Sequence, residues 1–347
     1  MIRVLYFGNI LSKHGYTPTT IENLSSLLQA EDVDIRISSD KRNKLLRFFD
    51  MFIFFFKHRK ETDVVLIDTY STLNFWYAVL IGMLSYYYKI KYIPILHGGK
   101  LPRRLDCSRK ISARLFGRSM INVAPSPYLY SEFIQRGFHN TIVIPNFINE
   151  SDYEIKERDN VTPIKLLWVR SFSEGYNPQM AIKCLSKLRK KNEGATLLMI
   201  GGTNGGDACL NATKQLAVEL GVADAVEFTG KLSKKELIKR STECNVFINT
   251  TNADNTPVSV IEAMAVGIPV VSTNVGGIPY LIRDGENGLL VEVGDVDGMV
   301  NKLELLVDNP SLVLRLSRAS IATGRDYYSS NVKEAWRKLL KEIVICS

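Results

Sequence analysis

The residues of this sequence that could bind an anion gather at the start of one predicted helix, within residues 254–271. Thr256 is a favourable helix N-cap, Pro257 suits the first helical position, and Gly267 stands where the helix would end. The first backbone amides of a helix have no partner within it, and the helix dipole adds positive potential there. The segment therefore predicts an anion site formed by the amides of Val258, Ser259 and Val260.

Two carboxylates flank this predicted anion site. Asp254 lies just before the helix and Glu262 about one turn inside it. Amides can hold phosphates while carboxylates accept hydrogen bonds from hydroxyls, so the combination suits a sugar nucleotide. Each part is common by itself, because capped helices and solvated acidic side chains occur throughout α/β proteins. On the pattern alone, an ordinary helix of an α/β fold remains the alternative.

The elements that must position this helix are short apolar segments that alternate with longer helical patterns. A first series of predicted strands covers residues 2–7, 64–67, 92–96, 121–124 and 142–145. A second series covers residues 165–169, 196–200, 225–228, 246–248 and 268–272. Apolar strands without alternation, placed between helices, are typical of parallel sheets covered on both faces. Two such series predict an α/β protein with two doubly wound domains.

The domain boundary is expected in the polar stretch of residues 149–163, which is the best linker in the sequence. We therefore predict domains at residues 1–150 and 151–330. Residues 331–347 follow as a C-terminal amphipathic helix with Val332, Trp336 and Leu339 on one face. The pattern leaves open where that face is buried, and a return to the first domain is one arrangement.

Residues 254–277 resemble the signature of family 4 of the retaining glycosyltransferases, also called group 1. That family has two glutamates separated by seven residues, and here Glu262 is the second while Asp254 replaces the first. Residues 145–148, 226–231 and 284–291 resemble the family in turn, so that the likeness extends over nearly the whole chain. It implies the GT-B fold, in which two Rossmann-like domains face a cleft that holds the active site. The N-terminal domain would take the acceptor and the C-terminal domain the nucleotide sugar.

The resemblance also assigns roles to residues of the second domain. Asp254 would contact the transferred sugar, Glu262 the ribose hydroxyls, and the amides at 258–260 the diphosphate. Arg170, after the predicted strand 165–169, matches the phosphate-binding arginine of the family. The lysine that usually follows five or six residues later is missing, so Lys231 is the candidate to replace it. A surface position at a strand end is the alternative for Arg170.

Two candidates lie after predicted strands of the N-terminal half, where α/β sheets bind ligands. Gly8 and Gly15 flank the loop after residues 2–7, and glycine lets backbone approach a ligand closely, so Gly15 is a candidate donor-binding residue. His97 follows the strand 92–96 and resembles the family's histidine that faces the transferred sugar. A lone histidine is also a common structural residue, and that alternative stays open.

The expected reaction is departure of a nucleoside diphosphate from an anomeric carbon. Arg170 and the helix amides could stabilise the charge that builds on the leaving phosphate without a metal. The five cysteines and four histidines are dispersed along the chain, which argues against a zinc site and a disulfide framework. We therefore expect neither metal nor cofactor, with a UDP-sugar as the donor. The resemblance implies retention of the anomeric configuration.

The charge of the chain is unevenly distributed. Residues 36–118 contain 17 Lys and Arg against 6 Asp and Glu, a local net charge of +11 within a total of +8. Residues 41–60 hold six phenylalanines between basic flanks, a composition typical of helices at a membrane surface. A core helix with a solvated charged end is the alternative. An anionic membrane is therefore an expected partner, whereas no motif indicates nucleic acid.

The N-terminus lacks the pattern of a signal peptide, and the longest apolar stretch, residues 73–88, is shorter than the roughly 20 residues that span a bilayer. We expect a buried helix there and a cytoplasmic protein, with peripheral attachment to the inner face of the cell membrane. The expected function is sugar transfer from a nucleotide diphosphate sugar to a glycan or lipid-linked glycan in surface polysaccharide biosynthesis. A nucleotide-sugar epimerase of the same fold and a non-catalytic nucleotide-sugar-binding subunit are the alternatives.

Overall fold

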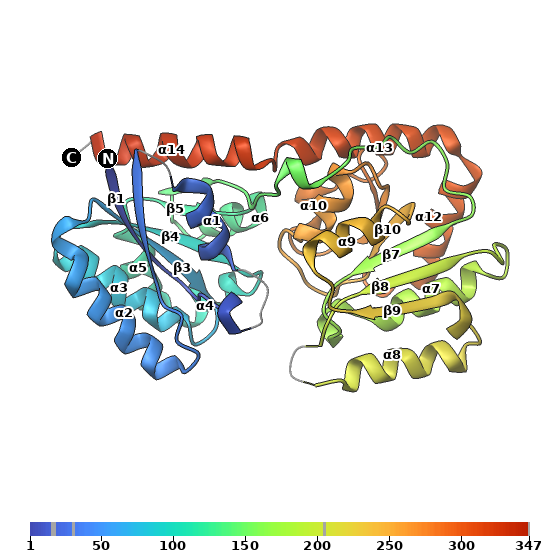
Figure 1. The fold of residues 1–347 in the computed structure, drawn as a ribbon, viewed down its shortest axis with the longest axis horizontal. Coiled ribbons are helices and arrows are strands. Elements are labelled where there is room, and N and C mark those ends of the chain that lie inside the picture. Colours follow the sequence, from blue (N-terminus) through green and yellow to red (C-terminus); the bar gives the residue numbers. More distant parts are fainter. Residues whose placement is uncertain (15–18, 30–31, 204–205, 346–347) are drawn as a thin grey trace. The chain divides into compact units, whose positions relative to one another are not determined.

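The computed structural model describes residues 1–14, 19–29, 32–203 and 206–345 of the chain. The chain divides into two compact units, one formed by Met1–Asn146 together with the C-terminal helix and one by Phe147–Tyr328. Within the described residues, each unit contains a parallel six-stranded sheet with helices on both faces (Figure 1). This confirms the prediction of two doubly wound α/β domains.

The sheet of the N-terminal unit has the strand order β2-β1-β3-β4-β5-β6. Its strands are β1 (Ile2–Phe7), β2 (Val33–Ser38), β3 (Val64–Tyr70), β4 (Lys91–His97), β5 (Asn122–Ala124) and β6 (Thr141–Val143). The order reverses at β1, which pairs with β2 on one side and β3 on the other. Open α/β sheets bind ligands at the carboxyl ends of strands beside such a reversal. Tyr70 and His97 pair at that end of β3 and β4.

The helices of this unit are α1 (Thr20–Leu28), α2 (Lys44–His58), α3 (Phe75–Tyr87), α4 (Leu101–Cys107), α5 (Arg109–Gly117) and α6 (Pro127–Gln135). Helix α1 begins with a capping box between Thr19 and Glu22. Helix α2 packs against α3, and α3 against α5, so the three form one layer (Figure 1). Six residues of α3 are buried, whereas Trp76, Tyr86 and Tyr87 are exposed, so the helix predicted within residues 73–88 is present but is buried only in part.

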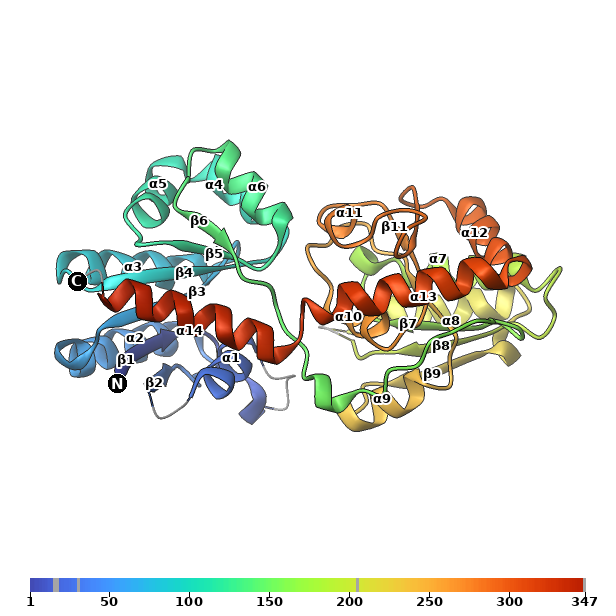
Figure 2. The same cartoon turned by 90° about the horizontal axis from the view of Figure 1, so that it is seen from above.

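The C-terminal helix α14 (Ser329–Ile345) crosses back to the N-terminal unit and packs against α1 and β1 (Figure 2). Its buried face includes Val332, Trp336 and Leu339, the residues expected to need a partner. Arg337 adds an ion pair to Asp32 at 2.6 Å. The apolar face of the last helix is therefore covered by the first unit rather than by the unit that precedes it in sequence.

The sheet of the C-terminal unit has the order β12-β11-β10-β7-β8-β9, again with a reversal at its first strand. Its strands are β7 (Lys165–Val169), β8 (Thr196–Ile200), β9 (Val226–Gly230), β10 (Val246–Asn249), β11 (Val270–Thr273) and β12 (Leu289–Val291). Leu166 and Trp168 of β7 join an apolar cluster on one face, and Leu167 joins a second cluster on the other. Side chains alternate between the faces of a strand, so both faces of this sheet need an apolar cover.

The helices that supply this cover are α7 (Pro178–Leu188), α8 (Ala208–Glu219), α9 (Lys234–Ser241), α10 (Val258–Ala265), α11 (Ile278–Leu281), α12 (Val296–Asp308) and α13 (Pro310–Arg325). Residues of α7 and α12 belong to the first cluster, while α10 belongs to the second and packs under α13. Short 3-10 helices lie at Ser12–His14, Arg59–Glu61, Glu150–Asp152, Glu174–Tyr176 and Ala223–Ala225.

The polar stretch at residues 149–163, expected as a linker, packs on the C-terminal unit instead. The amide of Ile148 donates to Tyr327 O at 2.9 Å, and the amide of Arg158 donates to the Ser317 hydroxyl at 2.8 Å. Val161 is buried in the first apolar cluster of that unit. The division falls after Asn146, a few residues before the predicted boundary at 150. The stretch is polar because its side chains face water, while its backbone is bonded to the domain surface.

Candidate functional site

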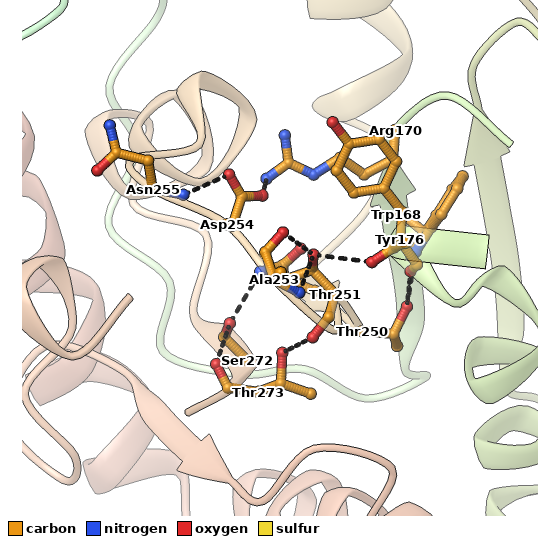
Figure 3. A network of polar contacts seen from close by, with 12 residues as sticks. Trp168, Arg170, Tyr176, Thr250, Thr251, Ala253, Asp254, Asn255, Ser272 and Thr273 are labelled. Carbon is orange, nitrogen blue, oxygen red and sulfur yellow. Dashed lines mark hydrogen bonds and ion pairs between the residues drawn. The ribbon is translucent and has the colours of Figure 1, made fainter. Parts of the chain in front are cut away.

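Arg170 and Asp254 form an ion pair at the carboxyl end of β7 (Figure 3). Arg170 Nη2 donates to Asp254 Oδ2 at 2.7 Å, and the two side chains are only 13% and 15% exposed. The guanidinium lies over the Tyr176 ring at 5.1 Å from its centroid. Among the described residues, Arg170 Nε is buried without a hydrogen-bond partner. The structure thus brings together two of the predicted catalytic residues and leaves the arginine with a donor for a further acceptor.

The backbone around Asp254 is fixed by a glycine pair. The amide of Gly277 donates to Asp254 O at 3.1 Å, and Asp254 Oδ1 accepts from the amide of Asn255 at 2.8 Å. A Cβ at Gly276 would lie 2.1 Å from Asp254 O, and one at Gly277 would lie 2.0 Å from Asn255 O. Gly276 also has a φ of +58°, which disfavours other residues. The site therefore depends on two glycines that let the loops touch.

Buried hydroxyl groups support the same loop from below (Figure 3). Trp168 Nε1 donates to Thr250 Oγ1 at 3.0 Å, and that hydroxyl donates to Tyr176 O at 2.9 Å. Thr273 Oγ1 donates to Thr251 O at 2.7 Å. The residues after β10 are therefore tied to β7, to the end of β11 and to the backbone of Tyr176, whose ring lies beneath Arg170.

We expect Gly276→Ala to disturb the position of Asp254 beyond the ordinary strain of a left-handed alanine. That strain costs about 1–2 kcal/mol, and the clash with Asp254 O should add to it. Gly285→Ala is a matched control, because Gly285 has a φ of +76° and nothing within 4 Å of its Cβ position. Thermal unfolding should show the larger loss of stability for Gly276→Ala. The sugar transfer that the sequence predicts should fall by about 100-fold in this variant alone, and equal losses in both variants would contradict the close fit.

Helix α10 begins one residue later than predicted. Val258 is its first residue and Pro257, with φ −71° and ψ 120°, is its N-cap, so the assignment of Thr256 as N-cap is wrong. Pro257 offers no side chain for capping, and the amide of Val260 turns back to Pro257 O at 3.1 Å. Of the three amides expected to hold a diphosphate, that of Val260 is therefore engaged within the chain. Those of Val258 and Ser259 keep the first-turn positions, where a helix provides no partner.

Glu262 lies on α10 with 13% of its side chain exposed, and Oε1 accepts from Lys234 Nζ at the start of α9. Lys234 also donates to the Tyr153 hydroxyl and lies 5.1 Å from the centre of that ring. Burial, together with the charge of Glu262, raises the pKa of Tyr153 well above its ordinary value. Lys234 and Tyr153 were not foreseen from the sequence. The capping box at Ser233 and Glu236 fixes the start of α9, but nothing local points to Glu262.

Lys231 follows β9 directly and is exposed at the same sheet edge as Arg170. Two adjacent glycines, Gly201 and Gly202, pack against these two positions. A Cβ at Gly201 would lie 1.7 Å from Arg170 O, and one at Gly202 would lie 3.5 Å from Lys231 Cβ. The proposal that Lys231 replaces the missing phosphate-binding lysine is thus compatible with where the chain places it.

His97 lies in the N-terminal unit, at the carboxyl end of β4. Its Nε2 is 2.8 Å from Asp68 Oδ1, and its ring stacks on Tyr70 with 4.8 Å between centroids. The other predicted residue of this half, Gly15, lies outside the described residues. Asp68 and Tyr70, both on β3, were missed, although a carboxylate directly after the apolar run 64–67 is a signal that the sequence does contain.

Within the described part of the chain, no three side chains of His, Cys, Asp and Glu are grouped so that they could hold a metal ion. Independence from metals stays a prediction. None of the described helices combines the length and the apolar character that crossing a bilayer requires.

Comparisons with known proteins connect this chain to glycosyltransferases. The family model described as "Glycosyl transferases group 1" matches residues 150–323. An uncharacterized glycosyltransferase of Haemophilus influenzae is 33% identical over 128 residues, which are 37% of this chain and 36% of the relative. A GDP-mannose-dependent alpha-(1-6)-phosphatidylinositol monomannoside mannosyltransferase of Mycobacterium tuberculosis is 28% identical over 193 residues, 53% of this chain and 46% of that protein. The chain thus spans a third to a half of the length of these curated relatives.

A likeness over the whole fold comes from solved structures. The structure of HepE from Anabaena in complex with UDP and glucose matches 99% of this chain and 100% of its own, with a TM-score of 0.76 and 15% identity. At that identity the match concerns the fold alone.

Proposed function

The chain belongs to the group 1 glycosyltransferases, and we propose that it is a retaining enzyme that transfers a sugar from a nucleotide diphosphate sugar. The acceptor in this proposal is a glycan or lipid-linked glycan of a surface polysaccharide. The observation that carries the proposal is the ion pair of Arg170 and Asp254, which lies at the carboxyl ends of the strands of the second sheet. Arg170 Nε has no acceptor in this pair. A buried guanidinium with an unfilled donor beside a carboxylate fits a ligand that combines phosphate with sugar hydroxyls.

In this proposal Arg170 stabilises the leaving diphosphate. Charge develops on the phosphate oxygens as the anomeric bond breaks, and preorganised positive groups at that place lower the barrier. Lys231 lies at the same sheet edge, and the amides of Val258 and Ser259 add donors at the start of α10. No step requires a metal ion. We propose that these groups act without one.

Asp254 and Glu262 are the acceptors for hydroxyl groups. When the diphosphate engages Arg170, Asp254 is released from part of its ion pair and can accept from the transferred sugar. One oxygen of Glu262 accepts from Lys234. The second oxygen can accept from the ribose, because both oxygens of a carboxylate are acceptors. We propose that His97 contacts the transferred sugar.

A UDP-sugar is the first donor to test and GDP-mannose the second. The support is indirect: HepE was solved with UDP and glucose, and the mycobacterial relative is named as GDP-mannose-dependent. The experiment is a screen for donor hydrolysis and transfer across UDP- and GDP-sugars, with and without EDTA. We expect cleavage of one donor class at the same rate in EDTA. Conversion of the donor to an epimer without acceptor would favour the epimerase, and loss of activity in EDTA that magnesium or manganese restores would contradict metal independence.

Attachment to an anionic membrane is the second part of the proposal, and the phenylalanine-rich helix α2 supports it. The phenylalanines divide between two faces: Phe55 is fully buried, while Phe49 is 61% exposed and Phe52 is 38% exposed. Leu45 and Ile53 extend the exposed face, at 72% and 65%. Neither the predicted core helix nor the predicted membrane-surface helix therefore describes all six phenylalanines. We call the exposed residues Leu45, Leu46, Phe49, Phe52 and Ile53 the α2 apolar face.

Basic side chains lie in the same helical layer. Lys41, Lys44, Lys57 and Lys60 flank the α2 apolar face along the chain, and Arg109, Lys110 and Arg114 are exposed on α5. Arg104 belongs to the same basic segment, but its guanidinium donates twice to Ser71 O and is a structural group. An apolar face with basic neighbours matches the surface of a helix that lies in a membrane interface.

We expect the protein to float with anionic vesicles at low salt. Each Lys or Arg near the surface contributes about 1 kcal/mol that salt screens, whereas inserted apolar side chains resist salt. Reversal of Arg109, Lys110 and Arg114 to Glu should abolish the salt-sensitive part, and Phe49→Ser with Ile53→Ser the salt-resistant part. Val218→Ser, at a 63% exposed apolar residue of the C-terminal unit, is the matched control. Failure of the wild type to float at low salt would favour a soluble acceptor.

A further inference from the structure

A buried carboxylate holds one ring nitrogen of His97. Asp68 on β3 has no exposed surface, and its Oδ1 lies 2.8 Å from His97 Nε2 on β4. The same oxygen accepts a hydrogen bond from the Tyr6 hydroxyl on β1, also at 2.8 Å. These three strands are neighbours in the sheet, so the contacts join the carboxyl ends of β1, β3 and β4. The cluster lies at the order reversal of the N-terminal sheet, where ligands bind in such folds.

The second carboxylate oxygen indicates that Asp68 is more than a packing residue. Among the described residues, Asp68 Oδ2 is buried without a hydrogen-bond partner. A Cβ at Gly8 would lie 2.5 Å from this oxygen, so the loop after β1 closes over it. A buried acceptor without a partner destabilises the fold, and native proteins keep few of them. Such a group is expected where its charge serves a neighbour, and here the neighbour is His97.

The geometry indicates which ring nitrogen of His97 carries a proton. A carboxylate only accepts hydrogen bonds, so Nε2 must carry the proton that points to Asp68 Oδ1. In the neutral ring the other nitrogen, Nδ1, then has a lone pair and accepts. Tyr70 stacks on the ring at an interplanar angle of 22° and fixes its plane. Carboxylates that orient a functional histidine through its second nitrogen are a recurrent arrangement.

We propose that Asp68 is a positioning residue of the transferase, which keeps the proton of His97 on Nε2 and presents Nδ1 as an acceptor to a hydroxyl of the transferred sugar. The inference rests on the proposed function, since it takes the sugar as the group that His97 contacts. Asp68 itself touches no ligand in this scheme. The Tyr6 hydroxyl donates to Asp68 and fixes its carboxylate, and the carboxylate accepts from Nε2 and fixes the His97 ring.

The test compares Asp68→Leu, Asp68→Asn and His97→Gln. Asp68→Leu removes every hydrogen bond at similar volume and should lower kcat by about 10- to 100-fold, with unchanged affinity for the nucleoside diphosphate. Asp68→Asn retains an oxygen for Nε2 but loses the charge, so its loss should be smaller. The double variant with His97→Gln should be no slower than His97→Gln alone, because both changes act through one ring.

Nitrogen-15 NMR of the His97 ring separates positioning from simple stability. We expect the wild type to carry its proton on Nε2 and Asp68→Leu to populate both tautomers. Asn122→Leu is a matched control, since Asn122 is also fully buried and hydrogen-bonded in this unit, to Phe116 O and Asn140 Oδ1. It should reduce stability and leave kcat unchanged.

A folded Asp68→Leu with normal kcat, or a wild type with the proton on Nδ1, overturns the inference. If the wild type transfers no sugar from any donor, the proposed function fails. The ring tautomer in wild type and Asp68→Leu then still decides whether Asp68 orients His97.

Discussion

Asp254→Ala is expected to lower kcat by roughly 10- to 100-fold while a nucleoside diphosphate binds at least as tightly as to the wild type. The lost group is a carboxylate that accepts from the transferred sugar, and a hydrogen bond to a charged group contributes about 1.5–3 kcal/mol. About 1.4 kcal/mol corresponds to a factor of ten. Binding should not suffer, because Asp254 occupies Arg170 Nη2 in the ligand-free protein and the diphosphate must displace it there.

The measurement pairs calorimetry with the nucleoside diphosphate and turnover at saturating donor. Asp224→Ala is the matched control, since Asp224 also accepts from an arginine, Arg189 at 3.2 Å, but is 70% exposed and away from the sheet end. Its kcat and affinity should equal those of the wild type. Normal turnover by a folded Asp254→Ala would remove Asp254 from the reaction, and weaker diphosphate binding would mean that the carboxylate orders Arg170 rather than occupying it.

The strands that were predicted best are those buried on both faces. The predicted bounds of β1, β7 and β8 coincide with the observed ones, because each strand contains an apolar run of four residues, at 4–7, 166–169 and 197–200. Strand β2 was missed. It alternates Val33, Ile35 and Ile37 with Asp34 and Arg36, and as an edge strand it pairs on one side only. Strict alternation over such a run is the pattern of a half-buried strand, so β2 could have been predicted and was missed because only continuous apolar runs were taken as strands.

The faces of α2 were also readable in principle. Residues Met51 and Phe55, four apart, are buried, whereas Phe49 and Ile53, also four apart, are exposed. A helical period of 3.6 residues separates these pairs on opposite sides. The number of phenylalanines in residues 41–60 does not distinguish these two faces. It therefore left both a core helix and a membrane-surface helix possible.

The candidate site was predictable only for residues that follow the ends of predicted strands. Arg170 and Asp254 follow strand ends, and the ends of parallel strands meet at one edge of a sheet, so their proximity could be expected. The same rule reaches Asp68 and His97, which follow the predicted strands 64–67 and 92–96. The partner of Glu262 could not be predicted. Lys234 comes from another element, and its contact depends on how the elements pack rather than on spacing within a helix or strand.

Glu262→Ala is expected to weaken the binding of a nucleoside diphosphate by roughly 10- to 100-fold, with a smaller effect on kcat at saturating donor. The carboxylate would accept from the ribose, which does not change during the reaction, so its contribution is equal in the ground state and the transition state. The magnitude again follows from about 1.5–3 kcal/mol for a charged hydrogen bond. Lys234 orients the carboxylate in advance, which limits the entropy lost on binding.

Glu304→Ala is the control that separates nucleotide recognition from the loss of an ion pair between a half-buried carboxylate and an exposed lysine. Glu304 accepts from Lys191 at 2.8 Å and its side chain is 19% exposed, close to the 13% of Glu262, but it lies on α12. Both variants should lose similar stability in thermal unfolding, since each leaves a lysine without its carboxylate. Only Glu262→Ala should lose affinity in calorimetry. Unchanged affinity in a folded Glu262→Ala would place the ribose elsewhere and leave Glu262 as a structural partner of Lys234 and Tyr153.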